Sequence, residues 1–192
     1  MKKPSRTPLR PEEIIELLKL VRTLFDFHAK LRQSNLLAQL IQFPKTPTRL
    51  SESIVCHAAA SGLLLPDNPA IERIFLGGKE GDVIIQVHDN RPRRIEVKAA
   101  ASSSFSQFGE KDVTADYLIW LDFGMAFKDS TINEVTAHVL PDPGKYVTPG
   151  KISLQTFLKL SDKLRAVKIN PETLKLNPAL FDIPPNILED IR

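Results

Sequence analysis

A β-hairpin followed by a buried strand is the feature that most constrains the fold of this chain. Residues 82–87 are rich in β-branched side chains, a turn cluster of about five residues follows, and residues 94–99 alternate between charged and apolar side chains. This pattern is typical of two antiparallel strands. Residues 117–121 form a continuous apolar run, which favours a central strand covered on both faces.

Helical periodicity on the N-terminal side of the hairpin adds the second kind of element. Apolar residues recur at helical spacing from about residue 11 to residue 32, and acidic residues follow Pro11 where they suit a first turn. Shorter helices are expected over 36–43 and 49–61. In the last of these, small and apolar residues surround the helix and Glu52 is the only acid, which predicts coverage on more than one side.

The C-terminal part is expected to begin with a strand and end without regular structure. Val135, Ala137 and Val139 alternate with polar residues, which predicts a strand. Apolar residues between 154 and 167 recur at helical spacing and predict a C-terminal helix. The chain after Asn170 is rich in proline, so it is expected to be irregular and to pack through its apolar residues.

A chain of 192 residues is long enough for one domain with its own core. We therefore expect a single domain over residues 1–192, divided into three parts. These are a basic arm and helical extension over 1–47, a core over 48–140, and a helix with a proline-rich tail over 141–192.

Composition excludes several classes of protein. The single cysteine, Cys56, rules out an internal disulfide framework and a cysteine-ligated zinc ribbon. No apolar run reaches the roughly 18 residues that span a bilayer, and no apolar segment follows the basic N-terminus directly. We therefore expect a cytoplasmic protein without membrane contact. The net charge of +3 is mildly favourable for a polyanionic partner.

The hairpin brings acidic and basic side chains together. Strand alternation places Arg94, Glu96 and Lys98 on one face, and a five-residue loop would pair Asp82 with Lys98 and Ile84 with Glu96. Two carboxylates that lie close together repel each other and favour a hard cation such as Mg²⁺ between them. A lysine ammonium beside that ion could hold an attacking water, which suits metal-assisted phosphodiester hydrolysis.

Asp82, thirteen intervening residues and then Glu96-Val97-Lys98 resemble the motif of the PD-(D/E)xK nuclease superfamily, which includes many type II restriction endonucleases. A helix bearing Glu52 precedes these residues, and a helical stretch and an apolar strand follow them, as in the core of that superfamily. The resemblance covers roughly residues 48–140. It implies an α/β, restriction-endonuclease-like fold with a central mixed β-sheet flanked by helices, here with an N-terminal helical extension. Gly81 stands where many members have proline.

The resemblance also implies a role for each motif residue. Asp82 and Glu96 would bind Mg²⁺, and the Val97 carbonyl is a possible third ligand. Lys98 would orient or activate the water. Glu52 would hold a second metal ion or a metal-bound water. An alternative that needs no catalysis is a solvated sheet face, on which these charges form cross-strand pairs, with Glu52 as an acid favoured by the helix dipole.

Four further polar residues are predicted to contact DNA. Gln107 follows the lysine of the motif, where family members often carry a polar helper. Arg91, Arg93 and Arg94 stand at the hairpin tip and are either phosphate contacts or ordinary solubility charges.

The resemblance as a whole predicts a Mg²⁺-dependent endonuclease of the type II restriction kind that hydrolyses double-stranded DNA as a homodimer. Two alternatives remain. One is a structure-specific or recombination nuclease similar to Holliday-junction resolvases, and the other is a non-catalytic DNA-binding subunit on the same fold.

Overall fold

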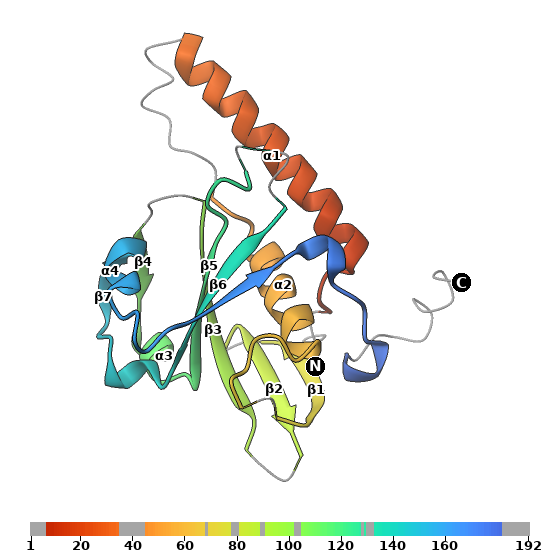
Figure 1. The fold of residues 1–192 in the computed structure, drawn as a ribbon, viewed down its shortest axis with the longest axis vertical. Coiled ribbons are helices and arrows are strands. Elements are labelled where there is room, and N and C mark those ends of the chain that lie inside the picture. Colours follow the sequence, from red (N-terminus) through yellow and green to blue (C-terminus); the bar gives the residue numbers. More distant parts are fainter. Residues whose placement is uncertain are drawn as a thin grey trace, which may run out of the picture.

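The computed structural model describes residues 7–34, 45–67, 69–77, 81–88, 91–101, 105–127, 129 and 133–181. Within them a mixed six-stranded sheet is flanked by helices (Figure 1). Its strands, in spatial order, are β1 (Ile71–Leu76), β2 (Val83–Val87), β3 (Arg93–Ala100), β5 (Tyr117–Asp122), β6 (Val135–Pro141) and β8 (Arg165–Ile169). The predicted α/β class with a mixed sheet, flanking helices and an N-terminal helix is therefore confirmed.

The strand pairing is antiparallel everywhere in this sheet except between β3 and β5, which run parallel. A parallel pair needs a crossover connection. Here the crossover contains β4 (Phe105–Phe108) and the short helix α3 (Glu110–Val113). β4 pairs with β7 (Gly150–Ser153) in a separate two-stranded sheet, and α4 (Leu154–Leu158) follows β7 directly.

Two helices cover one face of the six-stranded sheet. They are α1 (Pro11–Ser34) and α2 (Thr48–Ala60), and both predictions for them are confirmed. Every residue of α2 from Leu50 to Ala59 is buried, as its apolar circumference predicted. Gly62 follows α2 with φ +70°, a conformation that favours glycine and ends the helix.

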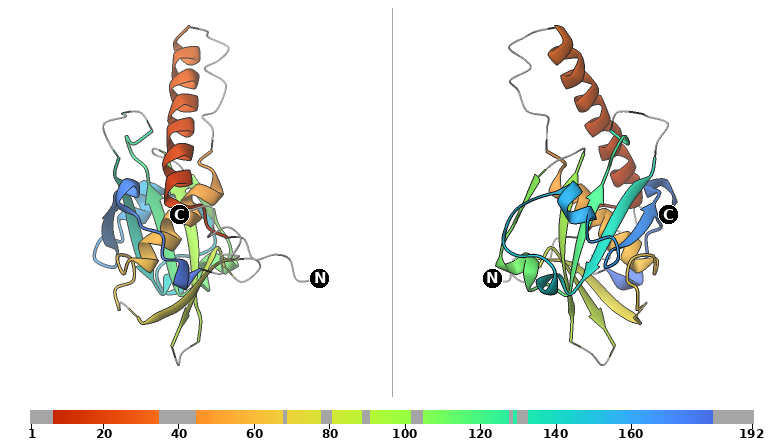
Figure 2. Two further views of the ribbon diagram at one scale, coloured as in Figure 1. Left: turned by 90° about the vertical axis from the view of Figure 1, so that its right-hand side faces the viewer. Right: turned by 60° about the vertical axis from the view of Figure 1, so that its left-hand side comes forward.

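The two faces of the sheet carry two hydrophobic clusters, because side chains alternate along each strand. Ile95 and Val97 of β3 pack with α1 and α2 in the larger cluster. Phe108 and Trp120 pack with α4 in the smaller cluster on the opposite face. Figure 2 shows α1 running past the edge of the sheet, with its C-terminal half away from the rest of the described chain.

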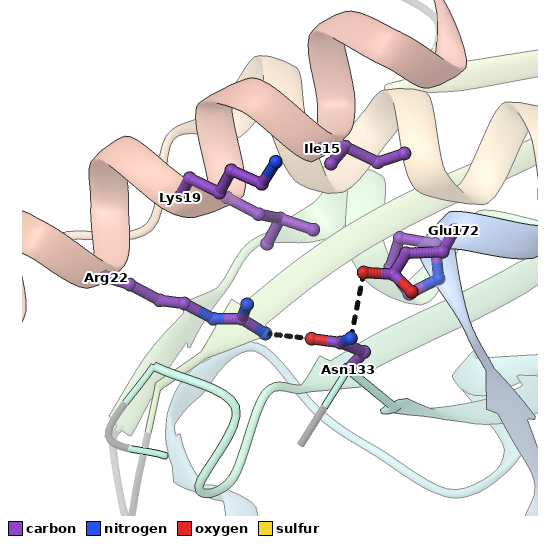
Figure 3. A pocket seen from close by; sticks show the side chains of 7 residues that line it. Ile15, Lys19, Arg22, Asn133 and Glu172 are labelled. Atoms are coloured by element: carbon purple, nitrogen blue, oxygen red, sulfur yellow. Dashed lines mark hydrogen bonds between the residues drawn. The ribbon is translucent and has the colours of Figure 1, made fainter. Parts of the chain in front are cut away.

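Hydrogen bonds hold α1 at a fixed rotation about its own axis. The Arg22 guanidinium donates to the Ala126 carbonyl at 2.6 Å and to Asn133 Oδ1 at 2.9 Å. The Asn133 amide in turn donates to Glu172 Oε1 at 2.8 Å, across a small pocket lined also by Lys19 (Figure 3). Among the described residues, no helix is both long and apolar enough to cross a membrane.

The predicted C-terminal helix over 154–167 is wrong. The helix ends at Leu158, and Arg165–Ile169 form the edge strand β8, paired antiparallel with β6. Val167 and Ile169 pack in the larger cluster, while Ala166 and Lys168 between and before them are exposed, so this part of the segment alternates as an edge strand does. After it come two single turns of 3₁₀-helix, η3 (Pro171–Thr173) and η4 (Pro178–Leu180), in the irregular tail that was predicted.

The expected helix over 36–43 lies outside the described residues. The segment before the hairpin, expected to be loop with a short strand near Ile74, forms the six-residue strand β1. Its burial pattern is irregular, and a bulge between Ile71 and Arg73 interrupts its pairing with β2.

Candidate active site

The hairpin places Asp82 beside Glu96. Ile84 pairs with Arg94 and not with Glu96, so the register differs by two residues from the expected one. A shift of two keeps every side chain on its expected face. The Asp82 N–H donates to the Ile95 carbonyl at 3.0 Å, which continues the ladder one residue beyond β2.

A backbone hydrogen bond fixes the direction of the Asp82 side chain. The Val97 N–H donates to Asp82 Oδ2 at 2.9 Å. This bond crosses from one strand of the hairpin to the other and holds the carboxylate against β3. The Val97 N–H thus contacts the candidate site directly, and the predicted contact of the Val97 carbonyl with a metal ion remains a prediction.

A lysine that the sequence analysis did not single out lies between the two acids. Lys111 Nζ is 3.1 Å from Asp82 Oδ1 and 2.7 Å from Glu96 Oε2. Lys111 belongs to α3, in the crossover, and half of its side chain is exposed. One ammonium thus bridges two carboxylates that come from neighbouring strands.

Lys98 contacts a different acid from the one predicted. Its Nζ lies 2.7 Å from Asp112 Oδ1, and Asp112 is almost fully buried. The other oxygen of Asp112 accepts the Gly109 N–H at 2.7 Å. The Lys98 ammonium also lies 5.9 Å from the ring centre of Phe108. Asp82, Glu96, Lys98, Lys111 and Asp112 form the group that we call the charge cluster.

Glu96 is the electrostatic centre of the charge cluster. Its side chain is 1% exposed, and neither carboxylate oxygen makes a well-directed hydrogen bond within the described part of the chain. Burial, together with the negative charges of Asp82 and Asp112, raises the pKa of Glu96 to about 7, although Lys111 acts in the opposite direction. The contacts with Glu96 and Asp82 raise the pKa of Lys111 despite its partial burial.

These residues fit a magnesium ion in two respects. Glu96 is a buried carboxylate without directed donors, and the point between it and Asp82 already attracts the Lys111 ammonium. Mg²⁺ is commonly bound by one or two carboxylates and several waters, so a pair of acids suffices. In the residues that the structure describes, no three His, Cys, Asp or Glu side chains are grouped as a metal site.

Glu52 is placed apart from this pair. It lies on α2, which covers the face of the sheet formed by Ile95 and Val97. Glu96 and Lys98 project from the opposite face, where their strand neighbours are Leu118 and Trp120. A second-metal role for Glu52 remains a prediction.

The three arginines at the hairpin tip make contacts within the chain. Arg91 pairs with Asp116 Oδ1 at 2.5 Å, and Arg93 lies 3.5 Å from Asp67 Oδ2. The Arg94 guanidinium donates to the Thr114 carbonyl. Arg91 and Arg93 line one shallow pocket on this side of the molecule. Their predicted contact with DNA is not tested by these interactions.

Gln107 lies on β4 opposite Lys151, with its side chain exposed. Its amide is 3.4 Å from the carbonyl of Phe108, a weak local contact. β4 leads through Gly109 into α3, so Gln107 stands four residues before Lys111 in the crossover. Its contact with DNA remains a prediction.

No protein-family model, curated protein or solved structure matches this chain.

Proposed function

We propose that this protein is a Mg²⁺-dependent endonuclease that hydrolyses phosphodiester bonds in double-stranded DNA, on a restriction-endonuclease-like fold. The order α2, β2 with Asp82, β3 with Glu96 and Lys98, crossover and β5 is the order that the PD-(D/E)xK resemblance implies. The observation that carries the proposal is the placement of two carboxylates from neighbouring strands, Asp82 and the buried Glu96, beside each other in the hairpin.

Asp82 and Glu96 would hold the metal ion, with the Val97 carbonyl as a further predicted ligand. Glu52 lies on the helix that covers the opposite face of the sheet, so its predicted part with a second metal ion would not be at this ion. Bound Mg²⁺ would withdraw charge from the scissile phosphate and make an attacking water more acidic. Lys98 and Lys111 place two ammonium groups next to the carboxylates, where they can contact phosphate oxygens or the attacking water. Asp112 acts as a positioning residue, since it holds Lys98 through a buried ion pair.

The biological setting follows from the type II restriction reading. Such an enzyme would act on duplex DNA in the cytoplasm, and a two-fold dimer would match a palindromic site. The hairpin arginines and Gln107 would contact the DNA, chiefly its phosphates.

A second candidate is a DNA-binding subunit without catalysis. One observation favours it: Lys111 already compensates Asp82 and Glu96, so the acids are paired without any metal. A resolvase-like nuclease differs from the proposed enzyme only in the shape of its substrate. One experiment with three substrates separates these functions.

The experiment incubates the purified protein and Mg²⁺ with long duplex DNA, a four-way junction or single-stranded DNA, followed by gel analysis. Discrete duplex fragments support the proposed restriction activity, whereas cleavage of the junction alone supports the resolvase alternative. A shifted but uncut band supports the binding subunit. If none of the three DNA substrates is cleaved or shifted, a function on DNA is overturned.

Site variants show whether the charge cluster carries any cleavage. Asp82→Ala and Glu96→Ala should abolish cleavage and leave DNA binding close to that of the wild type. Asp162→Ala is the matched control, because Asp162 is exposed and pairs only with the neighbouring Lys163 in the described structure. Normal cleavage by Asp82→Ala would refute the site assignment.

A further inference from the structure

α1 has two apolar faces, and the described residues cover only one of them. Ile14, Leu18, Val21 and Phe25 are buried in the larger cluster. A second row faces solvent, with Leu20 61%, Leu24 49% and Phe27 62% exposed. We call Leu20, Leu24 and Phe27 the outer stripe.

The spacing of the outer stripe is that of a helix–helix seam. Its members are four and three residues apart, and half-buried Leu17 and Leu31 continue the row by three and four residues. Alternating steps of three and four residues are the a/d pattern of paired helices. Three large exposed apolar side chains on two turns are unusual on a monomer surface and mark a contact site.

α1 cannot rotate about its axis to bury the outer stripe against the sheet. Arg22 ties α1 to Ala126 and Asn133, and Asn133 continues to Glu172 (Figure 3). Phe25 packs against Phe127 with ring centres 5.0 Å apart. These contacts fix the rotation of α1, so the outer stripe stays directed away from the sheet.

Charges beside the outer stripe indicate what covers it. Glu16, Thr23 and Lys30 are exposed, recur every seven residues and lie along one flank of the stripe. Glu16 and Lys30 stand seven residues on either side of Thr23. If two copies of α1 pair antiparallel about an axis at Thr23, each Glu16 meets Lys30 of the second copy. In a parallel pair, Glu16 of one copy and Lys30 of the second would lie at opposite ends of the paired helices and could not meet.

We propose that the outer stripe of α1 binds the same stripe of a second copy of this chain, antiparallel and across a two-fold axis beside Thr23. In this arrangement Leu20 packs near Leu24 of the second copy, and the reverse contact forms by symmetry. The proposal rests on α1 alone, so it stands or falls independently of the nuclease activity.

The oligomeric state is the first test. Sedimentation equilibrium should give twice the 21.5 kDa mass of one chain at micromolar concentration. Leu24→Lys should give the mass of one chain with an unchanged circular dichroism spectrum, because Leu24 is 49% exposed and does not belong to the larger cluster of the described residues. Asp26→Lys, a charge change elsewhere on the exposed surface of α1, should remain dimeric. A monomeric wild type, or a dimeric Leu24→Lys, would overturn the proposal.

The direction of pairing is the second test. Glu16→Lys should weaken the dimer about tenfold, since it places two lysines together at both ends of the seam. Adding Lys30→Glu should restore the wild-type dissociation constant. No effect of Glu16→Lys, or no rescue by the second change, contradicts the antiparallel arrangement.

A crosslinking test locates the axis. A short bismaleimide should join two copies of Thr23→Cys, because the residue lies next to its own symmetry mate, and Asp26→Cys should crosslink far less. The native Cys56 is fully buried and should not react. Equal crosslinking of the two variants would show that the axis is not at Thr23.

Discussion

Lys98 Nζ lies 2.7 Å from Asp112 Oδ1, and both side chains are withdrawn from solvent, with exposed fractions of 14% and 2%. The lysine of the Glu-x-Lys triplet is therefore paired with an acid of the crossover and not with Asp82. A buried carboxylate is tolerated only while its charge is compensated. The Lys98–Asp112 pair thus joins the proposed chemistry to the stability of the fold.

Lys98→Ala should show two separate effects. Single-turnover cleavage should fall roughly 10²–10⁴-fold, as expected on losing a positioned acid–base or electrostatic group. Urea unfolding should show a loss of about 2–4 kcal/mol, because Asp112 is left buried and uncompensated. The double variant Lys98→Met/Asp112→Asn should recover much of the stability and none of the rate. Full activity in Lys98→Ala would mean that the triplet is a coincidence of spacing.

Lys111→Met should increase the affinity for Mg²⁺. The ammonium and the metal ion compete for the same two carboxylates, so removing the ammonium should lower the dissociation constant about tenfold. Calorimetric titration at pH 8.5, where Glu96 is ionised, measures this. Lys145→Met, which removes an exposed lysine paired with Asp142, is the control. Unchanged or weaker Mg²⁺ binding would show that Lys111 does not compete with the ion.

The raised pKa of Glu96 predicts a stability that declines with pH in the absence of metal. The folded protein retains a proton on Glu96 up to about pH 7, whereas the unfolded chain releases it near the ordinary value of 4.5. The folded state therefore binds more protons between these pH values, and the free energy of unfolding falls as pH rises through them.

Glu96→Gln removes this titration. We compare the free energies of unfolding of the variant and the wild type in EDTA. The variant's value minus the wild-type value should rise by at most about 3 kcal/mol as the pH is raised from 5 to 8. Urea unfolding at several pH values measures the difference. Glu134→Gln, an exposed acid paired with Lys168, should show no such trend. A constant difference across this range would contradict the raised pKa.

The hairpin arginines should set the salt dependence of DNA binding. Phosphate contacts release counterions, so each arginine that contacts a phosphate adds about one to the slope of log affinity against log salt concentration. Arg93→Gln/Arg94→Gln should reduce that slope by about two, measured by fluorescence anisotropy without Mg²⁺. Lys168→Gln, on the edge strand β8, should leave it unchanged. If the double variant keeps the wild-type slope, the hairpin tip does not touch DNA.

Sequence patterns predicted correctly those helices and strands whose side-chain periodicity lies within one continuous segment. The helical spacing of α1, the apolar circumference of α2 and the alternation in β3 each appear within one segment, and each prediction is confirmed. The prediction for the C-terminal part was wrong because a short apolar segment can match both the helical and the strand periodicity. Pairing with β6, a contact distant in sequence, decides that Arg165–Ile169 is a strand.

The candidate site was predictable only where it lies within the hairpin. Asp82 and Glu96 were brought together by the expected alternation, even though the register was shifted by two residues. Lys111 and Asp112 were not found, because their approach to Glu96 and Lys98 depends on the crossover between two parallel strands. The sequence Glu110-Lys111-Asp112 reads locally as an ordinary charged turn.

The crossover also determines when the site can assemble during synthesis. The acids of the hairpin leave the ribosome before Lys111 and Asp112, and the crossover lies between strands β3 and β5, which pair with each other. Until the crossover has formed, Asp82 and Glu96 lie side by side without their lysine, and each repels the other. The nascent hairpin therefore gains its full stability late, after residues up to Ser153 have emerged, because β4 of the crossover also pairs with β7.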